Sequence, residues 1–333
     1  MILLWLQFLA AAILIILTGK RLTYIGDGIA EKKKWERSWV GLIIIAFSTS
    51  LPELFTSIAS AGIVKKPDLV YGNCFGSIAF NITLFALLDL IEGRGAFSSK
   101  INLKLILSAS VSILLILIVA IDMLVAPQFS FGWIGASSLI TVIAYVIGSR
   151  LSFSMNTGGS GMMEGEELNF KNVSSSYLWL NYFFCALLIL GGGIWLALTA
   201  GAIVDQTKLS GSFVGFLFLA VVTSLPELST TISAVKQGYY DMTVGIILGA
   251  NCFNILMLFF ADLVYTQGPL ARDASPQNVV MMLVGICLTS ILMIGIIYRS
   301  QKTFLRLGWD AISLIIVYIS GMVWLYHASS IAK

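Results

Sequence analysis

The chain has 333 residues, of which 58% are hydrophobic and only 11% are charged, and its formal net charge is +3. A soluble globular domain carries roughly 25% charged residues, so most of this chain cannot face water. The composition excludes a cytosolic enzyme, a disordered regulator and a nucleic-acid-binding protein. It predicts an all-α membrane protein.

Ten apolar stretches follow one another along the chain, each long enough for an α-helix to cross a bilayer, which takes about 20 residues. They lie at 2–19, 39–64, 68–91, 103–125, 129–148, 177–204, 212–235, 241–264, 277–298 and 307–326. Between the fifth and the sixth, a stretch rich in Gly, Ser, Asn and Glu predicts a flexible linker at 150–176. We therefore expect two units of five helices each, 1–149 and 177–333.

The positive charges are unevenly distributed over the predicted loops. Fifteen of the 20 Lys and Arg residues lie in the loops after the first, third, fifth, seventh and ninth spans. Since positive residues favour the cytoplasmic side, these loops and the linker are predicted to be cytoplasmic, and both termini to lie outside. The four cysteines and the single histidine show no zinc-site spacing. We expect no cofactor and no obligate protein partner, and a chain that works as a monomer in the lipid bilayer.

One hexamer, TSLPEL, occurs twice, at 49–54 and at 223–228. The match continues downstream, with a one-residue difference in length, and ends in FNI at 80–82 and at 253–255. Because each half has an odd number of predicted spans, the second copy enters the membrane with the opposite polarity. Such inverted repeats are typical of secondary transporters, whose substrate site lies where the repeats meet.

Each copy of the hexamer places a carboxylate, Glu53 or Glu227, in the middle of a long apolar span. A carboxylate at this depth costs a few kcal/mol on insertion scales, and more if it is isolated. No Lys or Arg occupies the mid-span region of either half. The compensating species must therefore be a bound cation or a proton.

The residues around each Glu favour a cation. Pro52 and Pro226 break the helix and free backbone carbonyls. The hydroxyl residues four and three positions earlier share the helical face of each Glu: Thr49 and Ser50 in the first copy, Thr223 and Ser224 in the second. An all-oxygen ligand set suits Ca²⁺, Na⁺ or a similar hard ion. The alternative is a proline-kinked packing helix with a protonated Glu, which the duplication in inverted halves disfavours.

The segments that end in FNI add further polar groups. Ser77 and Asn81 are four residues apart and share a helical face, as do Ala250 and Asn254 in the second half. The small-xxx-small spacing that lets helices approach closely occurs in both halves, at Gly72 and Gly76 and at Gly245 and Gly249. Beside a paired Glu site, Asn81 and Asn254 are predicted to line the pocket.

These duplicated motifs resemble the two α-repeats of the cation/Ca²⁺ antiporter superfamily, most closely its prokaryotic sodium/calcium exchangers. The resemblance implies a multi-pass protein of the prokaryotic plasma membrane, with ten helices in two inverted repeats of five. It also implies exchange of Ca²⁺ against Na⁺ by alternating access, with spans 1 and 6 as the moving gate. By position, it implies that Glu53, Glu227, Thr49 and Thr223 hold Ca²⁺, and that Na⁺ sites or pocket lining include Ala46, Ser50, Ser77, Asn81, Ala220, Ser224 and Asn254.

Several positions depart from the pattern of that family. Ser48 and Val222 stand where a Gly is usual before the Thr, and Ile78 stands where an Asn is usual. Ala250 stands where a Ser is frequent, and Asn254 where an Asp is frequent. The alternative function is therefore a H⁺/Ca²⁺ antiporter, or an antiporter of another divalent cation. A cation channel, which passes ions without occluding them, is a third possibility. We expect no enzyme, because no Ser/His or Cys/His pair suits an intramembrane protease.

Overall fold

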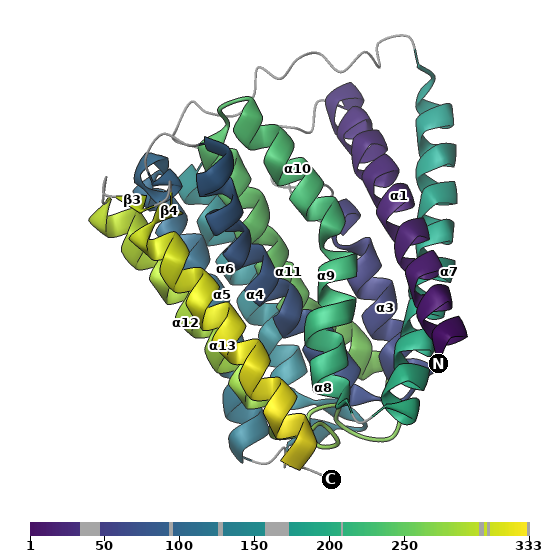
Figure 1. The fold of residues 1–333 in the computed structure, drawn as a ribbon. Helices are drawn as coiled ribbons and strands as arrows, with labels where there is room; N and C mark the ends of the chain where they lie inside the picture. The colour runs from purple at the N-terminus through teal and green to yellow at the C-terminus, as the bar shows by residue number, and fades with distance from the viewer. Residues whose placement is uncertain are drawn as a thin grey trace.

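The computed structural model describes residues 1–33, 47–92, 96–125, 129–156, 173–207, 209–299, 303–304 and 307–331, and they are mostly helical (Figure 1). The long helices are α1 (Ile2–Lys33), α4 (Pro67–Glu92), α5 (Ile106–Val125), α6 (Ala136–Asn156), α7 (Ser175–Gln206), α11 (Tyr240–Val264), α12 (Asn278–Tyr298) and α13 (Trp309–Ile331). The shorter ones are α3 (Leu51–Gly62), α8 (Gly211–Val214), α9 (Ala220–Thr223) and α10 (Leu225–Lys236), with a π-helical turn, η3 (Gly215–Leu219), between α8 and α9. Two 3₁₀ turns, η1 (Phe97–Lys100) and η2 (Leu103–Leu105), precede α5.

Within the described residues, 7 helices are long and apolar enough to cross a membrane, and the bent pair 211–223 and 225–236 makes up to 8. The chain is therefore a multi-pass membrane protein. Two of the ten expected spans are not among these. In the second, 39–64, residues 39–46 lie outside the described residues and α3 has only 12 residues. The apolar part of α6, Ala136–Ser152, is shorter than a full span. The count of ten stays a prediction.

Helix α1 is much longer than predicted, because it continues from the expected end at 19 to Lys33. The reason is a second apolar stripe beyond the charged pair Lys20–Arg21. Leu22, Ile25 and Ile29 recur at helical spacing and are buried. They form one hydrophobic cluster with residues of α7 such as Leu178 and Ile189. Tertiary packing, rather than the membrane, sets the length of α1.

Two expected helix starts are wrong, because short hairpins precede α6 and α13. β1 (Ser130–Phe131) pairs with β2 (Ile134–Gly135), and β3 (Thr303–Phe304) pairs with β4 (Leu307–Gly308). In the first hairpin Gly132 has a φ of +66°, a conformation that favours glycine. The helices therefore begin at Ala136 and Trp309, not at 129 and 307.

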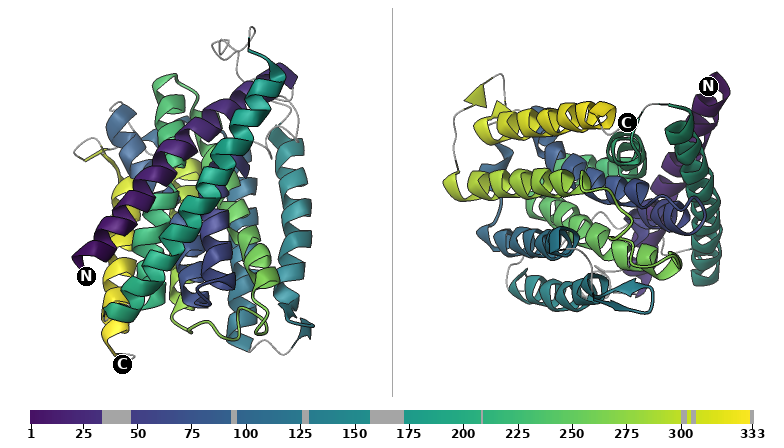
Figure 2. Two further views of the ribbon diagram at one scale, coloured as in Figure 1. Left: turned by 90° about the vertical axis from the view of Figure 1, so that its right-hand side faces the viewer. Right: turned by 90° about the horizontal axis from the view of Figure 1, so that it is seen from below.

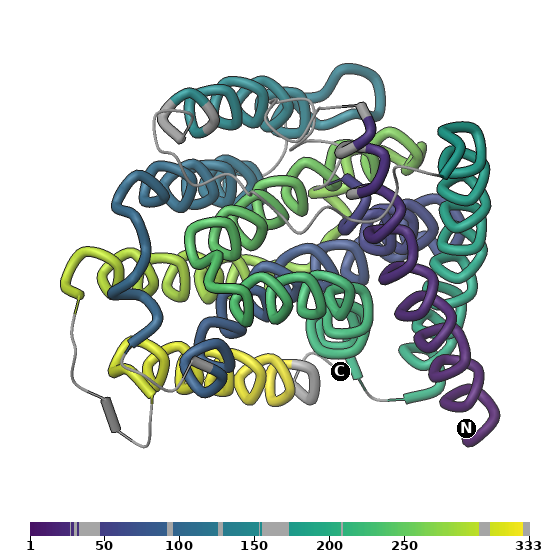
Figure 3. Tube along the Cα trace, turned by 90° about the horizontal axis from the view of Figure 1, so that it is seen from above, coloured from purple at the N-terminus to yellow at the C-terminus, as the bar shows by residue number. Residues whose placement is uncertain are grey.

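The two halves of the chain interlock at the centre of the bundle. Helix α4, from the first half, packs against α12 and α13 of the second half, and α11, from the second half, packs against α5 and α6 of the first. Both central helices are mostly buried. Helices α1 and α7 lie side by side along one edge of the bundle, away from α12 and α13 (Figures 2 and 3).

Two buried aspartates, at equivalent positions of the two halves, connect the central helices to the opposite half by hydrogen bonds. Near the end of α4, Asp89 accepts hydrogen bonds from the backbone N–H groups of Phe97 (2.6 Å) and Gly308 (2.6 Å). Near the end of α11, Asp262 accepts from the N–H groups of Leu270 (2.7 Å) and Gly135 (2.8 Å). Each carboxylate thus joins the loop after its own helix to the hairpin of the opposite half.

A second equivalent pair of aspartates acts at the other end of the same two helices. At the start of α4, the Oδ1 atom of Asp68 accepts from the backbone N–H of Ser275 and from the side chain of Asn278, both at 2.7 Å. At the start of α11, Asp241 accepts from the N–H of Asn102 at 2.7 Å. These contacts hold the residues at the start of α12 and just before α5. Each central helix thus binds the other half at both of its ends.

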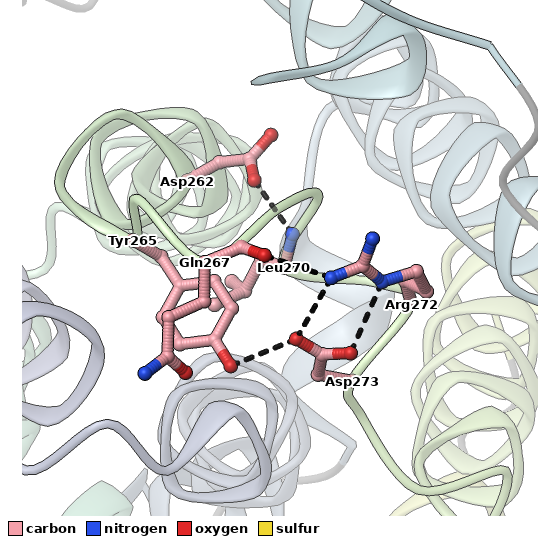
Figure 4. Close-up of polar contacts among 6 residues, drawn as sticks. All are labelled: Asp262, Tyr265, Gln267, Leu270, Arg272 and Asp273. Carbon is pink, nitrogen blue, oxygen red and sulfur yellow. Dashed lines mark hydrogen bonds and ion pairs between the residues drawn. The ribbon is translucent and has the colours of Figure 1, made fainter. Parts of the chain in front are cut away.

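The loop after α11 is held by a local network of polar contacts (Figure 4). The hydroxyl of Tyr265 donates to Asp273 (2.9 Å), which also pairs with Arg272 (3.2 Å). Burial, with the hydrogen bond and charge of Asp273, raises the pKa of Tyr265 to about 12. The hydrogen bond from Arg272 lowers the pKa of Asp273 below its ordinary value. The loop therefore carries an ionised Asp273 at neutral pH.

Candidate ion-binding site

Both TSLPEL segments interrupt their helices at the same residue of the motif, as predicted from Pro52 and Pro226. Ser50 (φ −98°, ψ 11°) and Ser224 (φ −87°, ψ 2°) have closely similar non-helical backbones and precede α3 and α10. In the second half the two helical parts are bent by 47° at this break. Since proline has no N–H and fits the first turn of a helix, each motif ends one helical part and starts the next.

The break places Glu53 and Glu227 in the first turns of α3 and α10. The side chains are 1% and 0% exposed. A helix N-terminus favours a negative charge, because its first N–H groups are unpaired and the helix dipole is positive there. The break in each helix thus supplies part of the stabilisation that a buried carboxylate requires.

Hydrogen bonds cross between the two motifs. The hydroxyl of Ser50 donates to Oε1 of Glu227, and the hydroxyl of Ser224 donates to Oε1 of Glu53, both at 3.1 Å. These two contacts are equivalent under exchange of the halves. Each serine thus serves the carboxylate of the other copy, and the two motifs meet at one site in the middle of the bundle.

Several buried oxygens at this site have no hydrogen-bond donor. The second carboxylate oxygen, Oε2, is without a partner in both Glu53 and Glu227. The same holds for the side-chain oxygens of Ser77, Asn81 and Asn254. Buried polar atoms are normally paired, and an orphaned one costs about 1–3 kcal/mol or more when charged. Two unpartnered carboxylate oxygens at one buried site, with further unpartnered oxygens on α4 and α11, are the ligand chemistry of a cation site.

Asn73 belongs to the site, although it was not among the predicted residues. Its amide donates to the carbonyl oxygen of Glu53 (3.3 Å) and to the hydroxyl of Ser57 (3.0 Å), and it accepts from the hydroxyl of Thr223 (3.2 Å). Asn73 therefore connects α3 to α9 across α4. The signal was present in the sequence, because Asn73 lies four residues before Ser77 on the face that also carries Asn81.

Asn251 is the second site residue that sequence reasoning missed. Its side-chain oxygen accepts from the amide of Asn81 at 3.2 Å, and its own amide nitrogen has no partner. Asn251 lies three residues before Asn254, a spacing that brings both to one side of α11. The polar lining therefore spans both central helices.

The remaining predicted residues fall into two groups. Thr49, Thr223 and Ala220 are buried at or just before the helix breaks, while Ala46 lies outside the described residues. The hydroxyl of Thr223 is also within 3.0 Å of the carbonyl of Leu219 in its own helix. The hydroxyl of Thr223 therefore contacts other protein oxygens at the site.

Close backbone packing joins α4 to the segment that precedes the second helix break. A Cβ atom on Gly72 would lie 2.6 Å from the carbonyl oxygen of Ser212, and one on Gly76 would lie 2.5 Å from that of Phe216. Both distances are shorter than any side chain allows. The predicted close approach is confirmed at these two glycines, and it lets η3 lie directly against α4. It is wrong for Gly245 and Gly249, because a Cβ atom at either would meet nothing within 4 Å.

Comparisons with known proteins decide the family. Two stretches of the chain, 3–153 and 177–327, match the family model of the sodium/calcium exchanger protein. The chain belongs to this family. Inner membrane protein YrbG of Escherichia coli (strain K12) is 30% identical to this exchanger-family chain over 258 residues, which cover 74% of the chain and 75% of YrbG. The family resemblance expected from the duplicated motifs is confirmed, and the family is one of transporters rather than enzymes.

Two solved structures share the fold of this family member. The sodium-calcium exchanger NCX_Mj is 22% identical with a TM-score of 0.59, covering 97% of this chain and 99% of that one. The H⁺/Ca²⁺ exchanger CAX is 14% identical with a TM-score of 0.69, covering 99% of this chain and 86% of that one. At these identities the likeness concerns the fold alone.

Proposed function

We propose that the chain is a secondary transporter that exchanges Ca²⁺ against Na⁺ across the membrane by alternating access. One observation carries the proposal: two buried carboxylates from equivalent motifs meet at one site, with their second oxygens unpartnered. A charge of about −2 matches one Ca²⁺, and the surrounding hydroxyl, amide and carbonyl oxygens are the ligands that Ca²⁺ prefers. The transported ions are the only non-protein groups that this mechanism needs.

We further propose that the fold consists of ten spans in two inverted repeats, joined by a cytoplasmic linker at 150–176, with both termini outside. The family model matches on either side of the linker. The repeat is also supported by two pairs of aspartates that make equivalent contacts in the two halves: Asp89 corresponds to Asp262, and Asp68 corresponds to Asp241. We also propose that the chain functions as a monomer.

The packing of the two peripheral helices supports alternating access. Helix α7 lies closely over α3, and Lys66, at the end of that region, pairs with Asp205 of α7. On the other side, α1 leaves a cavity of about 240 Å³ against α10, lined by Ile16, Lys20, Leu225, Leu228, Ser229 and Ile232. In the proposed orientation the cavity lies in the cytoplasmic half. The arrangement corresponds to a state closed towards the outside and looser towards the cytoplasm.

A H⁺/Ca²⁺ antiporter is the second candidate, and Ala250 is the observation that favours it. Ser77 offers a buried, unpartnered hydroxyl, whereas Ala250, its equivalent in the second half, offers no oxygen. A sodium ion has one ligand fewer on that side, while a proton needs only a carboxylate. The high TM-score with the H⁺/Ca²⁺ exchanger, whose fold alone is compared, does not distinguish the two.

Radioactive ⁴⁵Ca²⁺ uptake into proteoliposomes distinguishes the candidates. The proposal predicts uptake driven by an outward Na⁺ gradient at equal pH on both sides. Uptake that requires a pH gradient and does not depend on Na⁺ would show that H⁺, not Na⁺, is the coupling ion. Currents at rates above about 10⁶ ions per second, faster than conformational steps on the μs–ms scale, would contradict any exchanger.

A further inference from the structure

A hydrogen bond outside the candidate ion site connects α7 to the first motif. The hydroxyl groups of Ser48 and Tyr182 lie 2.7 Å apart, although the two residues are 134 positions apart in the chain. Ser48 is 1% exposed, and it stands two residues before the helix break at Ser50. On α1, a Cβ atom at Gly26 would lie 3.1 Å from the hydroxyl oxygen of Ser48 and 3.7 Å from the ring of Tyr182. The hydrogen bond is therefore enclosed between α1, α7 and the first motif.

This hydrogen bond lies at one end of a long contact between α7 and the first half. Further along α7, a Cβ atom at Gly193 would lie 3.1 Å from the backbone nitrogen of Thr56 in α3. At the far end Lys66 pairs with Asp205, but the side chain of Asp205 is 68% exposed, and exposed ion pairs contribute little. The bond of Tyr182 is the better shielded of the two polar contacts.

The second half has the equivalent contact without the hydroxyl groups. In the register set by the two TSLPEL motifs, Tyr182 of α7 corresponds to Phe8 of α1. Each of these rings packs edge-to-face against a tryptophan three residues earlier, with ring centroids 5.9 Å and 6.0 Å apart. Ser48 corresponds to Val222, which packs against the hydrophobic cluster that contains Phe8. Since neither Phe8 nor Val222 has a hydroxyl group, this pair cannot form the hydrogen bond.

The two contacts lie on opposite sides of the membrane in the proposed orientation. Tyr182 follows the cytoplasmic linker, whereas Phe8 lies near the outer N-terminus. Because the halves are inverted copies, the opposite state of the transporter arises when they exchange their arrangements. In that state α7 separates from the first motif and α1 closes on the second. The hydrogen bond is then present only in the state closed towards the outside, and no equivalent bond forms in the other.

We infer that the hydrogen bond between Ser48 and Tyr182 makes the two states unequal and holds the ion-free protein mainly in the state closed towards the outside; this inference rests on the proposed alternating access. Tyr182 is a positioning residue, because it acts on the ion site through the segment that carries Ser48 and Thr49. One hydrogen bond between uncharged groups shifts such an equilibrium about fivefold. An ion arriving from outside binds the minor state, so its apparent affinity is reduced by the small fraction of molecules in that state.

The test is Tyr182→Phe, which removes only the hydroxyl group, assayed by ⁴⁵Ca²⁺ uptake into right-side-out and inside-out membrane vesicles under the same gradient of the coupling ion. Loss of the bond raises the fraction open to the outside, so the KM for Ca²⁺ at the outer face should fall about fivefold. The KM at the cytoplasmic face, where the accessible state already predominates, should change by less than about twofold. Unfolding would not produce this difference, because it lowers the amount of active protein and hence the maximal rate at both faces.

A second variant and a matched control accompany this test. Ser48→Ala removes the other partner and should lower the outer KM by a similar factor. The double variant should differ little from either single variant, because all three lack the same bond. The control is Tyr177→Phe, which changes an exposed tyrosine of the same helix and should leave both KM values unchanged.

The possible failures are distinguishable. An outer KM that is unchanged in Y182F and S48A, or a change of equal size at both faces, would overturn the inference and leave the exchange function intact. Additive effects of the two substitutions would also contradict it, because they would then act through different contacts. Absence of gradient-driven Ca²⁺ uptake by the wild type would instead contradict the proposed function.

Discussion

Replacing Asp262 by Asn tests the contacts that lock the two halves together. Its carboxylate is 1% exposed and accepts from Leu270 N (2.7 Å), Gly135 N (2.8 Å) and Ser138 Oγ (2.6 Å). In Asp262→Asn one oxygen becomes an NH₂ group that faces a donor. Hydrogen bonds to a charged group contribute about 1.5–3 kcal/mol each. With one or two lost, we expect D262N to lose about 3–5 kcal/mol of stability.

The assay is thermal unfolding in detergent, followed by a thiol-reactive fluorophore. Cys74, Cys185 and Cys252 are buried and become reactive on unfolding. A loss of this size should lower the Tm by about 10 °C. The matched control is Asp273→Asn in the same loop, which breaks an exposed ion pair and should shift the Tm by less than about 2 °C. A D262N protein that melts within 2 °C of wild type would refute the proposed role of Asp262 in joining α11 to the hairpin before α6.

Three further outcomes are expected. Gly72→Ala should lower both the Tm and the transport rate, because its Cβ would lie 2.6 Å from a backbone oxygen of α8. The control Gly191→Ala, whose Cβ would meet nothing within 4 Å, should lower neither. Equal Tm values for the two variants would contradict the close packing at Gly72. Asn73→Ala should raise the KM for Ca²⁺ about tenfold, since about 1.4 kcal/mol of ligand positioning is lost, and an unchanged KM in uptake assays would exclude its role. Because Arg272 lowers the pKa of Asp273, the stabilising effect of this carboxylate is present above its ordinary pKa and is lost as the pH falls through the lowered value. In Arg272→Gln the stabilisation by the Asp273 carboxylate should be lost at a higher pH than in the wild type. Hydrogen exchange of the loop amides measures this pH midpoint. The same midpoint in both proteins would contradict the role of Arg272.

Local sequence signals predicted the centre of the molecule well. Pro52 and Pro226 act through the backbone of their own helices, so both breaks could be located without tertiary information. The central helices α4 and α11 begin and end within about one residue of the predicted bounds, since both are continuous apolar stretches between polar residues. The burial of Glu53 and Glu227 followed from their position within two other apolar stretches, 39–64 and 212–235.

Contacts between distant parts of the chain could not be predicted in this way. The pairing of Ser50 with Glu227 joins residues 177 positions apart, and helical spacing only suggested that Ser50 shares a face with Glu53. The length of α1 depends on packing against α7, and the functions of Asp89 and Asp262 depend on hairpins of the opposite half. In each case the partner is supplied by the fold and leaves no periodic signal near the residue.

The central claim is that Glu53 and Glu227 together bind the transported divalent cation. The most direct measurement is ⁴⁵Ca²⁺ uptake into proteoliposomes by Glu53→Gln and Glu227→Gln separately, with Asp273→Asn, a carboxylate in the exposed loop after α11, as the control. Glutamine keeps the size and one oxygen of each side chain but removes its charge. We predict that each glutamine variant loses gradient-driven uptake while D273N retains it. Full uptake by either glutamine variant would contradict the claim.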